Sequence, residues 1–221
     1  MRHFILGNGK SLLKTPLHLL KNEVTWGMNR INLLYDKINF RPTNYLMIDF
    51  NQQNEHNYWQ ESIKAHWNTP KWLWDGFRNG DKLFQTLEPI GEVPNTTWIE
   101  RCKKHHYYMA DNHMKRAESW HFPTLCTAFS GIGAVMQLAV MNGATEIYLL
   151  GCDLYSPDYR DNFFTQNYTD DQRPRDKMDN QNMTQVHRVA KRSSPVPIYN
   201  CTVGGALEVY ERKDIYQVLD G

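Results

Sequence analysis

Two absences from the 221-residue sequence limit where the protein works. No apolar run approaches the roughly 18 residues that a membrane-spanning helix requires. Neither sign of charge dominates, because 25 Lys and Arg stand against 24 Asp and Glu, which leaves a formal net charge of +1. A protein that coats nucleic acid or an anionic membrane carries a clear excess of one sign. We therefore expect a soluble cytoplasmic protein for which nucleic acid is not the main partner.

Paired metal ligands are also missing. The four cysteines are far apart and form no Cys-x-x-Cys motif: Cys102, Cys126, Cys152 and Cys201. A disulfide-stabilised domain is denser in cysteine, and a zinc site places its ligands close together. No Asp-x-Asp pair occurs, although metal-dependent transferases that hold a nucleotide diphosphate usually supply one. We expect reduced, mostly buried thiols and neither a bound metal nor another cofactor.

Short apolar segments recur along the chain with helical material between them, which is typical of a parallel α/β sheet. Five such strands are predicted, over residues 3–6, 24–28, 45–49, 146–150 and 196–200. A helix over Ser130–Met141 is apolar on nearly every face, so it should be buried against the sheet and end at Gly143. Residues 214–219 are expected to form a final short helix. The sequence predicts one Rossmann-like domain over residues 1–221, a parallel sheet flanked by helices.

Two segments depart from this pattern. Residues 52–122 hold six of the seven tryptophans and six of the nine histidines with poor periodicity. We interpret them as an aromatic-rich insertion, which either covers a pocket or packs as an irregular subdomain. Residues 156–192 are polar with few aliphatic side chains, so we predict a long, lid-like loop there.

A glycine turn follows the first strand directly. Gly7, Asn8 and Gly9 are followed by Ser11 in the first helical turn. Glycine permits close approach, so backbone N–H groups can face an anion at such a turn. The motif lacks the third glycine of a dinucleotide fingerprint and is not a P-loop. Both a plain turn and a phosphate cradle therefore stay open.

Polar residues stand where several predicted strands end. They are Asn8, Asn29 with Arg30, Asp49 and Asp153. In doubly wound sheets, ligands bind beyond the carboxyl ends of the strands, so these side chains should converge on one site. Each aspartate could bind a metal or a ribose diol, or could instead cap a helix.

His187 is a candidate general base, because imidazole titrates near neutral pH. It lies in a polar stretch, where the alternative is a simply solvated side chain. The neighbouring cations Arg188, Lys191 and Arg192 could face a phosphate or form a solvated surface.

These motifs, in this order, resemble the bacterial lipooligosaccharide sialyltransferases over about half the chain, mainly residues 3–51 and 128–190. The similar residues are the Gly7-Asn8-Gly9-Lys10-Ser11-Leu12 start, Asn29, Asp49, Ser130-Gly131 and the strand end Gly151-x-Asp153-x-Tyr155. The interval from Tyr155 to His187 also matches that family. Three positions depart from its pattern: Lys10 replaces proline, Asp49 replaces asparagine and Phe129 replaces threonine.

The resemblance implies metal-independent transfer of a sialic acid-like sugar from a CMP-linked donor to a glycan or small-molecule acceptor. It places the nucleotide against Gly7, Asn8, Gly9, Ser11, Asn29, Asp49, Ser130, Gly131 and Gly151. Asp153 and Tyr155 would lie at the reacting end of the donor, and His187 would take the proton of the acceptor hydroxyl. Tyr159 or Tyr168 could supply the family's second phosphate-binding tyrosine. The related transferases are often oligomeric, so a homo-oligomer is possible.

Two alternatives remain. The ending over residues 199–206 looks more like the 6-hydroxymethylpterin diphosphokinase-like proteins, which share the glycine start and the Gly-x-Asp strand end. A phosphotransferase of that kind would use ATP and magnesium on a pterin or another small alcohol, with Asp49 and Asp153 as metal ligands. The other alternative is a nucleotide-binding module without catalysis, in which residues 156–192 bind a partner.

Overall fold

The computed structural model describes residues 1–48, 58–75, 91–101, 124–125, 131–154, 163–165, 168 and 177–221. The strands within these ranges are β1 (Arg2–Leu6), β2 (Val24–Met28), β3 (Asn44–Met47), β4 (Lys71–Trp74), β5 (Thr96–Arg101), β6 (Thr124–Leu125), β7 (Glu146–Leu150), β8 (Ile198–Asn200) and β9 (Glu211–Arg212). The helices are α1 (Tyr58–Ala65), α4 (Gly131–Met141), α5 (Lys177–Ser193) and α6 (Ile215–Asp220), with the 3₁₀ helices η1 (Lys10–Lys14), η2 (Leu17–Leu20) and η3 (Asn29–Leu34).

The described strands form one sheet in the order β6-β5-β4-β3-β2-β1-β7-β8-β9, and each neighbouring pair is parallel. The chain starts at the centre of the sheet with β1 and builds outward to β6. It then returns through α4 to add β7 on the other side of β1. The strand order therefore reverses between β1 and β7, which is where doubly wound sheets bind their ligands.

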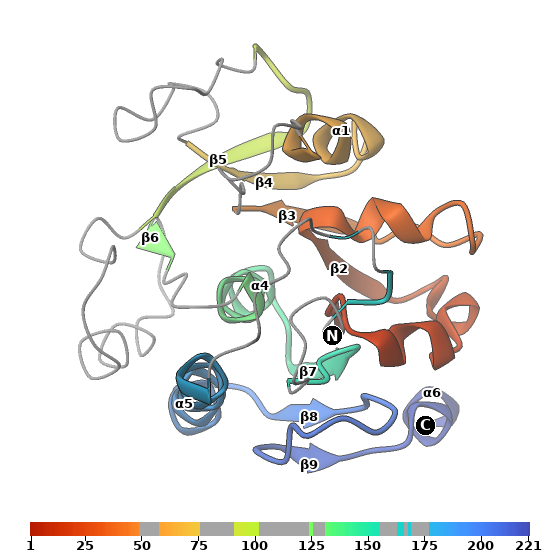
Figure 1. Cartoon of the computed structure of the whole chain (residues 1–221), viewed down its shortest axis with the longest axis vertical. Helices are drawn as coiled ribbons and strands as arrows, with labels where there is room; N and C mark the ends of the chain where they lie inside the picture. The colour runs from red at the N-terminus through yellow and green to blue at the C-terminus, as the bar shows by residue number, and fades with distance from the viewer. Residues whose placement is uncertain are drawn as a thin grey trace.

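Both faces of the sheet are covered, so its strands are apolar on both sides (Figure 1). Ile5 of β1 belongs to the core formed with α4 and α5. Its neighbours Phe4 and Leu6 belong to the core formed with η1, η3, α1 and α6. Figure 1 shows α4 and α5 on one side of the strands and α1 and α6 on the other. Successive side chains of a strand alternate between the faces, which explains this division.

The predicted fold class is confirmed, with all five predicted strands present as β1, β2, β3, β7 and β8. The predicted apolar helix is α4, after which Gly143 has a φ of +86°. The predicted last helix is α6, whose first N–H groups donate to the side chain of Asp214.

Two segment predictions need correction. The described parts of 52–122 are not a separate insertion, because α1, β4 and β5 extend the same parallel sheet. Residues 177–193, predicted as part of a lid-like loop, form helix α5. Over residues 183–193, the part of α5 whose burial the structure describes, the buried side chains are those of Val186, His187, Val189 and Ala190. A buried stripe of this kind within a polar stretch gives a weak helical signal.

Candidate functional site

The glycine turn packs tightly against the end of β7. The backbone N–H of Gly7 donates to the Leu150 oxygen at 2.7 Å, and that of Gly9 donates to the Gly151 oxygen at 2.9 Å. The Ser11 N–H donates to Asp153 Oδ2 at 2.9 Å, and the Ser11 hydroxyl donates to the other oxygen of the same carboxylate. A phosphate cradle needs N–H groups that face the ligand, and these three are already paired within the chain.

The carboxylate of Asp153 therefore takes the place that an anionic ligand was predicted to occupy. It lies at the beginning of η1, where a negative charge is favourable. These internal pairings argue against a phosphate cradle formed by Gly7, Gly9 and Ser11 and favour the interpretation as a plain turn. Gly151 has a φ of +65°, a left-handed conformation that explains the glycine there.

Replacing Asp153 should test this packing role. We expect Asp153→Ala to lower the free energy of unfolding by about 3 kcal/mol, because it leaves the Ser11 N–H and the buried Ser11 hydroxyl without an acceptor. Asp153→Asn keeps one acceptor and should lose about half as much. Urea unfolding measures both, with Asp36→Ala on the exposed surface as control. An Asp153→Ala protein as stable as the parent would contradict the packing role.

The side chain of Asn8, which follows β1, forms hydrogen bonds to the end of β2 and to Tyr168. Its Nδ2 donates to the Met28 backbone oxygen at 3.2 Å and to the Tyr168 hydroxyl at 2.7 Å. The Met28 oxygen can only accept, so the orientation of the amide is set. Asn8 Oδ1 is buried, and no described residue donates to it. A buried carbonyl oxygen without a donor is costly, so this atom is suited to accept from a bound ligand.

The segment around Tyr168 lies over the same strand ends. Phe164 donates its N–H to the Asn8 backbone oxygen at 2.8 Å. The guanidinium of Arg30 lies 3.6 Å from the centroid of the Tyr58 ring and donates to the backbone oxygen of Tyr168. Sequence reasoning named Tyr168 only as an alternative and gave no role to Tyr58. Arg30 was predicted as a site residue because it lies at the end of a predicted strand.

The beginning of α4 lies against this edge of the sheet. A Cβ atom built on Gly131 would be 3.7 Å from Asn29 Nδ2, 3.3 Å from the Met28 sulfur and 3.9 Å from Ile48 Cδ1. Asn29 has a φ of +48°, and its backbone oxygen accepts from the Tyr45 hydroxyl at 2.6 Å. The structure thus brings Asn8, Asn29 and Gly131 to one edge, where the positive end of α4 favours an anion.

Four predicted site residues lie outside the described residues: Asp49, Ser130, Tyr155 and Tyr159. Asp49 directly follows Ile48, and Ser130 directly precedes Gly131, so both are next in sequence to residues at this edge. Their roles stay predictions.

His187 is not at this edge. Its side chain is 2% exposed and packs edge-on against Tyr210, with ring centroids 5.5 Å apart. His187 Nδ1 is 3.1 Å from the Tyr210 hydroxyl, which also approaches the Met136 sulfur of α4 at 3.8 Å. Burial lowers the pKa of His187 to about 4. A general base needs access to its substrate and a pKa near the working pH, so this placement argues against the predicted role and for one in packing.

The thiols of Cys152 and Cys201 are free and buried, as predicted for them, and burial raises the pKa of both. Cys102 and Cys126 lie outside the described residues. Within the described ranges, no three His, Cys, Asp or Glu side chains are grouped so that they could hold a metal ion. None of the described helices combines the length and apolar character needed to cross a membrane.

Among solved structures, this fold is similar to that of a MAf glycosyltransferase from Magnetospirillum magneticum AMB-1. The match has 14% sequence identity and a TM-score of 0.56, and it covers 96% of this chain but 33% of the other. This chain thus spans about a third of the length of that protein. At this identity the likeness concerns the fold, and it gives no support to the sialyltransferase or diphosphokinase-like families. No model of a protein family matches the chain, and no curated protein does.

Proposed function

We propose that this domain is a glycosyltransferase that binds a nucleotide-activated sugar where β1, β2 and α4 meet. The observation that carries the proposal is the buried Oδ1 of Asn8, to which no described residue donates, at the edge where α4 begins. An acceptor beside a helix N-terminus suits a ligand with both N–H or hydroxyl donors and a phosphate. A nucleotide has both. The fold shared with a protein named as a glycosyltransferase supports sugar transfer as the reaction.

The donor that we propose is CMP-linked and carries a sialic acid-like sugar, as the motif order suggests. In the reaction, the acceptor hydroxyl attacks the anomeric carbon and releases its proton to water. The bond from that carbon to the phosphate oxygen breaks, and its electron pair stays on that oxygen. Negative charge then develops on the departing phosphate. The positive end of α4 and the guanidinium of Arg30 would stabilise that charge without a metal ion. Tyr155 remains the proposed hydrogen-bond donor to the leaving group.

A thermal-shift panel tests the ligand class. CMP, CDP, UMP, UDP, GDP, AMP and ATP are compared with and without magnesium. A ligand present at 100 times its Kd stabilises the folded state by about 2.7 kcal/mol, which a melting curve resolves. We expect the largest shift with CMP or CDP, equal with and without magnesium. A shift confined to ATP with magnesium would instead favour the phosphotransferase.

The reaction class is tested by incubation with CMP-sialic acid after treatment with EDTA. We expect CMP release and sugar transfer to survive EDTA. Binding of CMP without donor hydrolysis or transfer, across a broad set of acceptors, would favour the non-catalytic module.

Asn8→Ala should weaken nucleotide binding. Because the side chain would no longer accept from the ligand, we expect the Kd for CMP to rise about tenfold, which corresponds to about 1.4 kcal/mol. Asn44→Ala is the matched control, since Asn44 begins β3 at the opposite edge of the sheet. Isothermal titration calorimetry measures both. An unchanged Kd in Asn8→Ala, or an equal loss in Asn44→Ala, would move the binding site elsewhere.

A further inference from the structure

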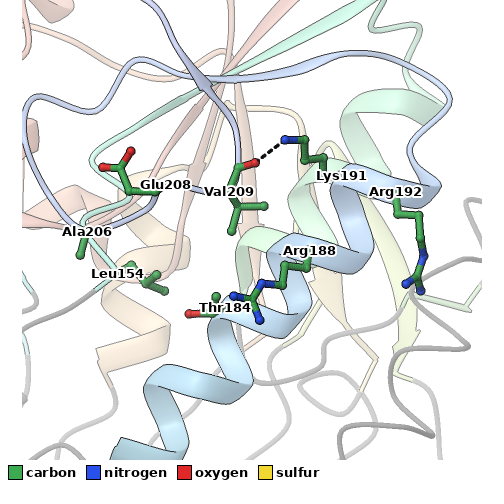
Figure 2. Close-up of a pocket in the computed structure, with 8 residues that line it drawn as sticks. All are labelled: Leu154, Thr184, Arg188, Lys191, Arg192, Ala206, Glu208 and Val209. Atoms are coloured by element: carbon green, nitrogen blue, oxygen red, sulfur yellow. Dashed lines mark hydrogen bonds between the residues drawn. The ribbon is translucent and has the colours of Figure 1, made fainter.

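A pocket lies on the face of the sheet that α5 covers. This pocket has a volume of about 620 Å³ and lies between α5 and the loop that follows β8 (Figure 2). Its lining residues are Leu154, Thr184, Arg188, Lys191, Arg192, Ala206, Glu208 and Val209. Leu154 and Val209 pack against the core that contains α4. None of the lining residues is among Asn8, Asn29, Arg30 and Gly131 of the proposed nucleotide site, so the pocket is formed by different side chains.

The wall formed by α5 is cationic. Thr184, Arg188 and Lys191 are spaced by four and three residues, so they lie on one side of the helix. Lys191 Nζ donates to the Val209 backbone oxygen at 2.7 Å, which joins the helix to the loop. The guanidinium of Arg188 has no hydrogen-bond or ion-pair partner among the described residues. Figure 2 shows it facing the pocket beside Thr184, while Arg192 extends away from Ala206 and Leu154.

The acidic residue at the rim does not cancel this charge. Glu208 Oε1 forms an ion pair with Arg212 Nη2 at 2.7 Å and also accepts from Arg212 Nε at 3.0 Å. Its carboxylate is therefore compensated by an arginine outside the pocket lining. The net charge of the lining remains positive, which favours an anion.

The floor is apolar and has an unusual backbone. Leu154 has a φ of +68°, a left-handed conformation that leucine rarely adopts. The backbone N–H of Ala206 donates to the backbone oxygen of Asp153 at 2.9 Å. Ala206 follows Gly205, whose φ is +73°. This hydrogen bond joins the turn at Asp153 and Leu154 to the turn at Gly205 and Ala206 beneath the pocket. Strained residues held by their surroundings often lie at ligand sites.

We propose that this pocket binds a phosphate ester carried on an apolar or ring-shaped body. The doubly charged phosphate would be held by Arg188, whose fork of donors matches phosphate oxygens, with Lys191 beside it. The ring or apolar body would lie on Leu154, Ala206 and Val209. This site is additional to the nucleotide site and does not depend on the reaction proposed above.

Phenyl phosphate is the probe, with benzyl alcohol as its uncharged counterpart, and isothermal titration calorimetry gives the Kd. We expect phenyl phosphate to bind and benzyl alcohol not to bind. Arg188→Gln should raise the Kd about tenfold, as expected for loss of a charge-assisted hydrogen bond. Ala206→Glu should abolish binding because it adds a carboxylate to the floor. CMP at saturation should leave the Kd within twofold.

The controls are matched in shape and charge. Ala206→Gln adds the same bulk as Ala206→Glu without the charge, and Lys64→Gln removes an exposed cation from α1. Lys64→Gln should keep the Kd within threefold, and Ala206→Gln should weaken binding less than Ala206→Glu does. Arg188 and Ala206 are exposed, so the variants should fold, and melting curves check this. The proposal is overturned if the parent protein does not bind phenyl phosphate at millimolar concentration, or if Arg188→Gln and Ala206→Glu bind it unchanged. Displacement by CMP would overturn the separation of the two sites.

Discussion

Lowering the pH from 7.5 to 4.5 should remove most of the stability of this domain, because three histidines are buried as neutral groups. His3, His66 and His187 are each at most 2% exposed, and burial lowers the pKa of each to about 4. In the unfolded chain, histidine titrates near pH 6.5. Between these values the unfolded state binds more protons, so stability is complete above pH 6.5 and is lost as the pH falls toward 4.

The size of the effect follows from the shift. One pKa unit corresponds to about 1.4 kcal/mol, so His66 and His187 each account for about 3 kcal/mol when the loss is complete. His3 acts in the same direction. A typical domain is stable by only about 5–15 kcal/mol in total. The combined loss is therefore large enough to unfold much of the protein.

The local contacts of His66 show why it stays neutral. Its Nδ1 lies 2.6 Å from the Ser62 backbone oxygen, which can only accept, so Nδ1 carries the proton. Its Nε2 then accepts from the Tyr35 hydroxyl. The ring is stacked on Tyr45 with the centroids 3.6 Å apart. A second proton on Nε2 would remove the Tyr35 hydrogen bond and leave a buried charge with no carboxylate among these contacts.

Urea unfolding at pH 7.5, 6.0, 5.0 and 4.5 measures the effect. His187→Gln cannot titrate, so its stability should fall less steeply with pH than that of the parent protein, although it will be less stable at pH 7.5 because packing is lost. His18→Gln is the control, since it removes an exposed histidine on the surface of η2. If the parent protein loses no stability between pH 7.5 and 5.0, the buried histidines do not control its acid sensitivity.

Elements with a strong apolar pattern could be predicted from the sequence, whereas elements that bury polar side chains could not. Helix α4 and strand β7 are almost wholly apolar, so periodicity identifies them. Strand β4 begins with Lys71, which is fully buried and donates to the backbone oxygens of Trp67 at 3.0 Å and Pro94 at 2.7 Å. A buried lysine held by carbonyl groups has no periodic signature. The same holds for His187 in α5.

The site shows a similar division. The rule that ligands bind beyond the ends of parallel strands predicted that Asn8 and Asn29 converge, and Asn8 indeed contacts Met28, the residue before Asn29. It could not predict that Tyr168 would bond to Asn8 across 160 residues, or that Asp153 would turn toward Ser11. Such contacts depend on the packed tertiary structure. An aspartate after a strand has the same sequence pattern whether it binds a ligand or caps a helix.

Gly7→Ala should be among the most destabilising substitutions in the chain, for a reason unrelated to ligands. A Cβ atom at Gly7 would lie 2.4 Å from the Gly151 backbone oxygen and 2.8 Å from its carbon. These are backbone atoms at the end of β7, in the centre of the sheet, so they cannot move aside cheaply. We expect a loss of about 3 kcal/mol, as in overpacked cores, and a fall in Tm of roughly 10 °C.

Gly91→Ala is the matched control, because nothing lies within 4 Å of its added Cβ and its φ is not in the left-handed range. It should leave the Tm within about 2 °C. The comparison also separates the two interpretations of the glycine turn. If Gly7 serves the packing of β1 against β7, Gly7→Ala loses stability in the absence of any ligand. If it served a phosphate instead, the variant would melt like the parent protein and lose only its response to CMP, because the conflict would then arise with the ligand and not with Gly151.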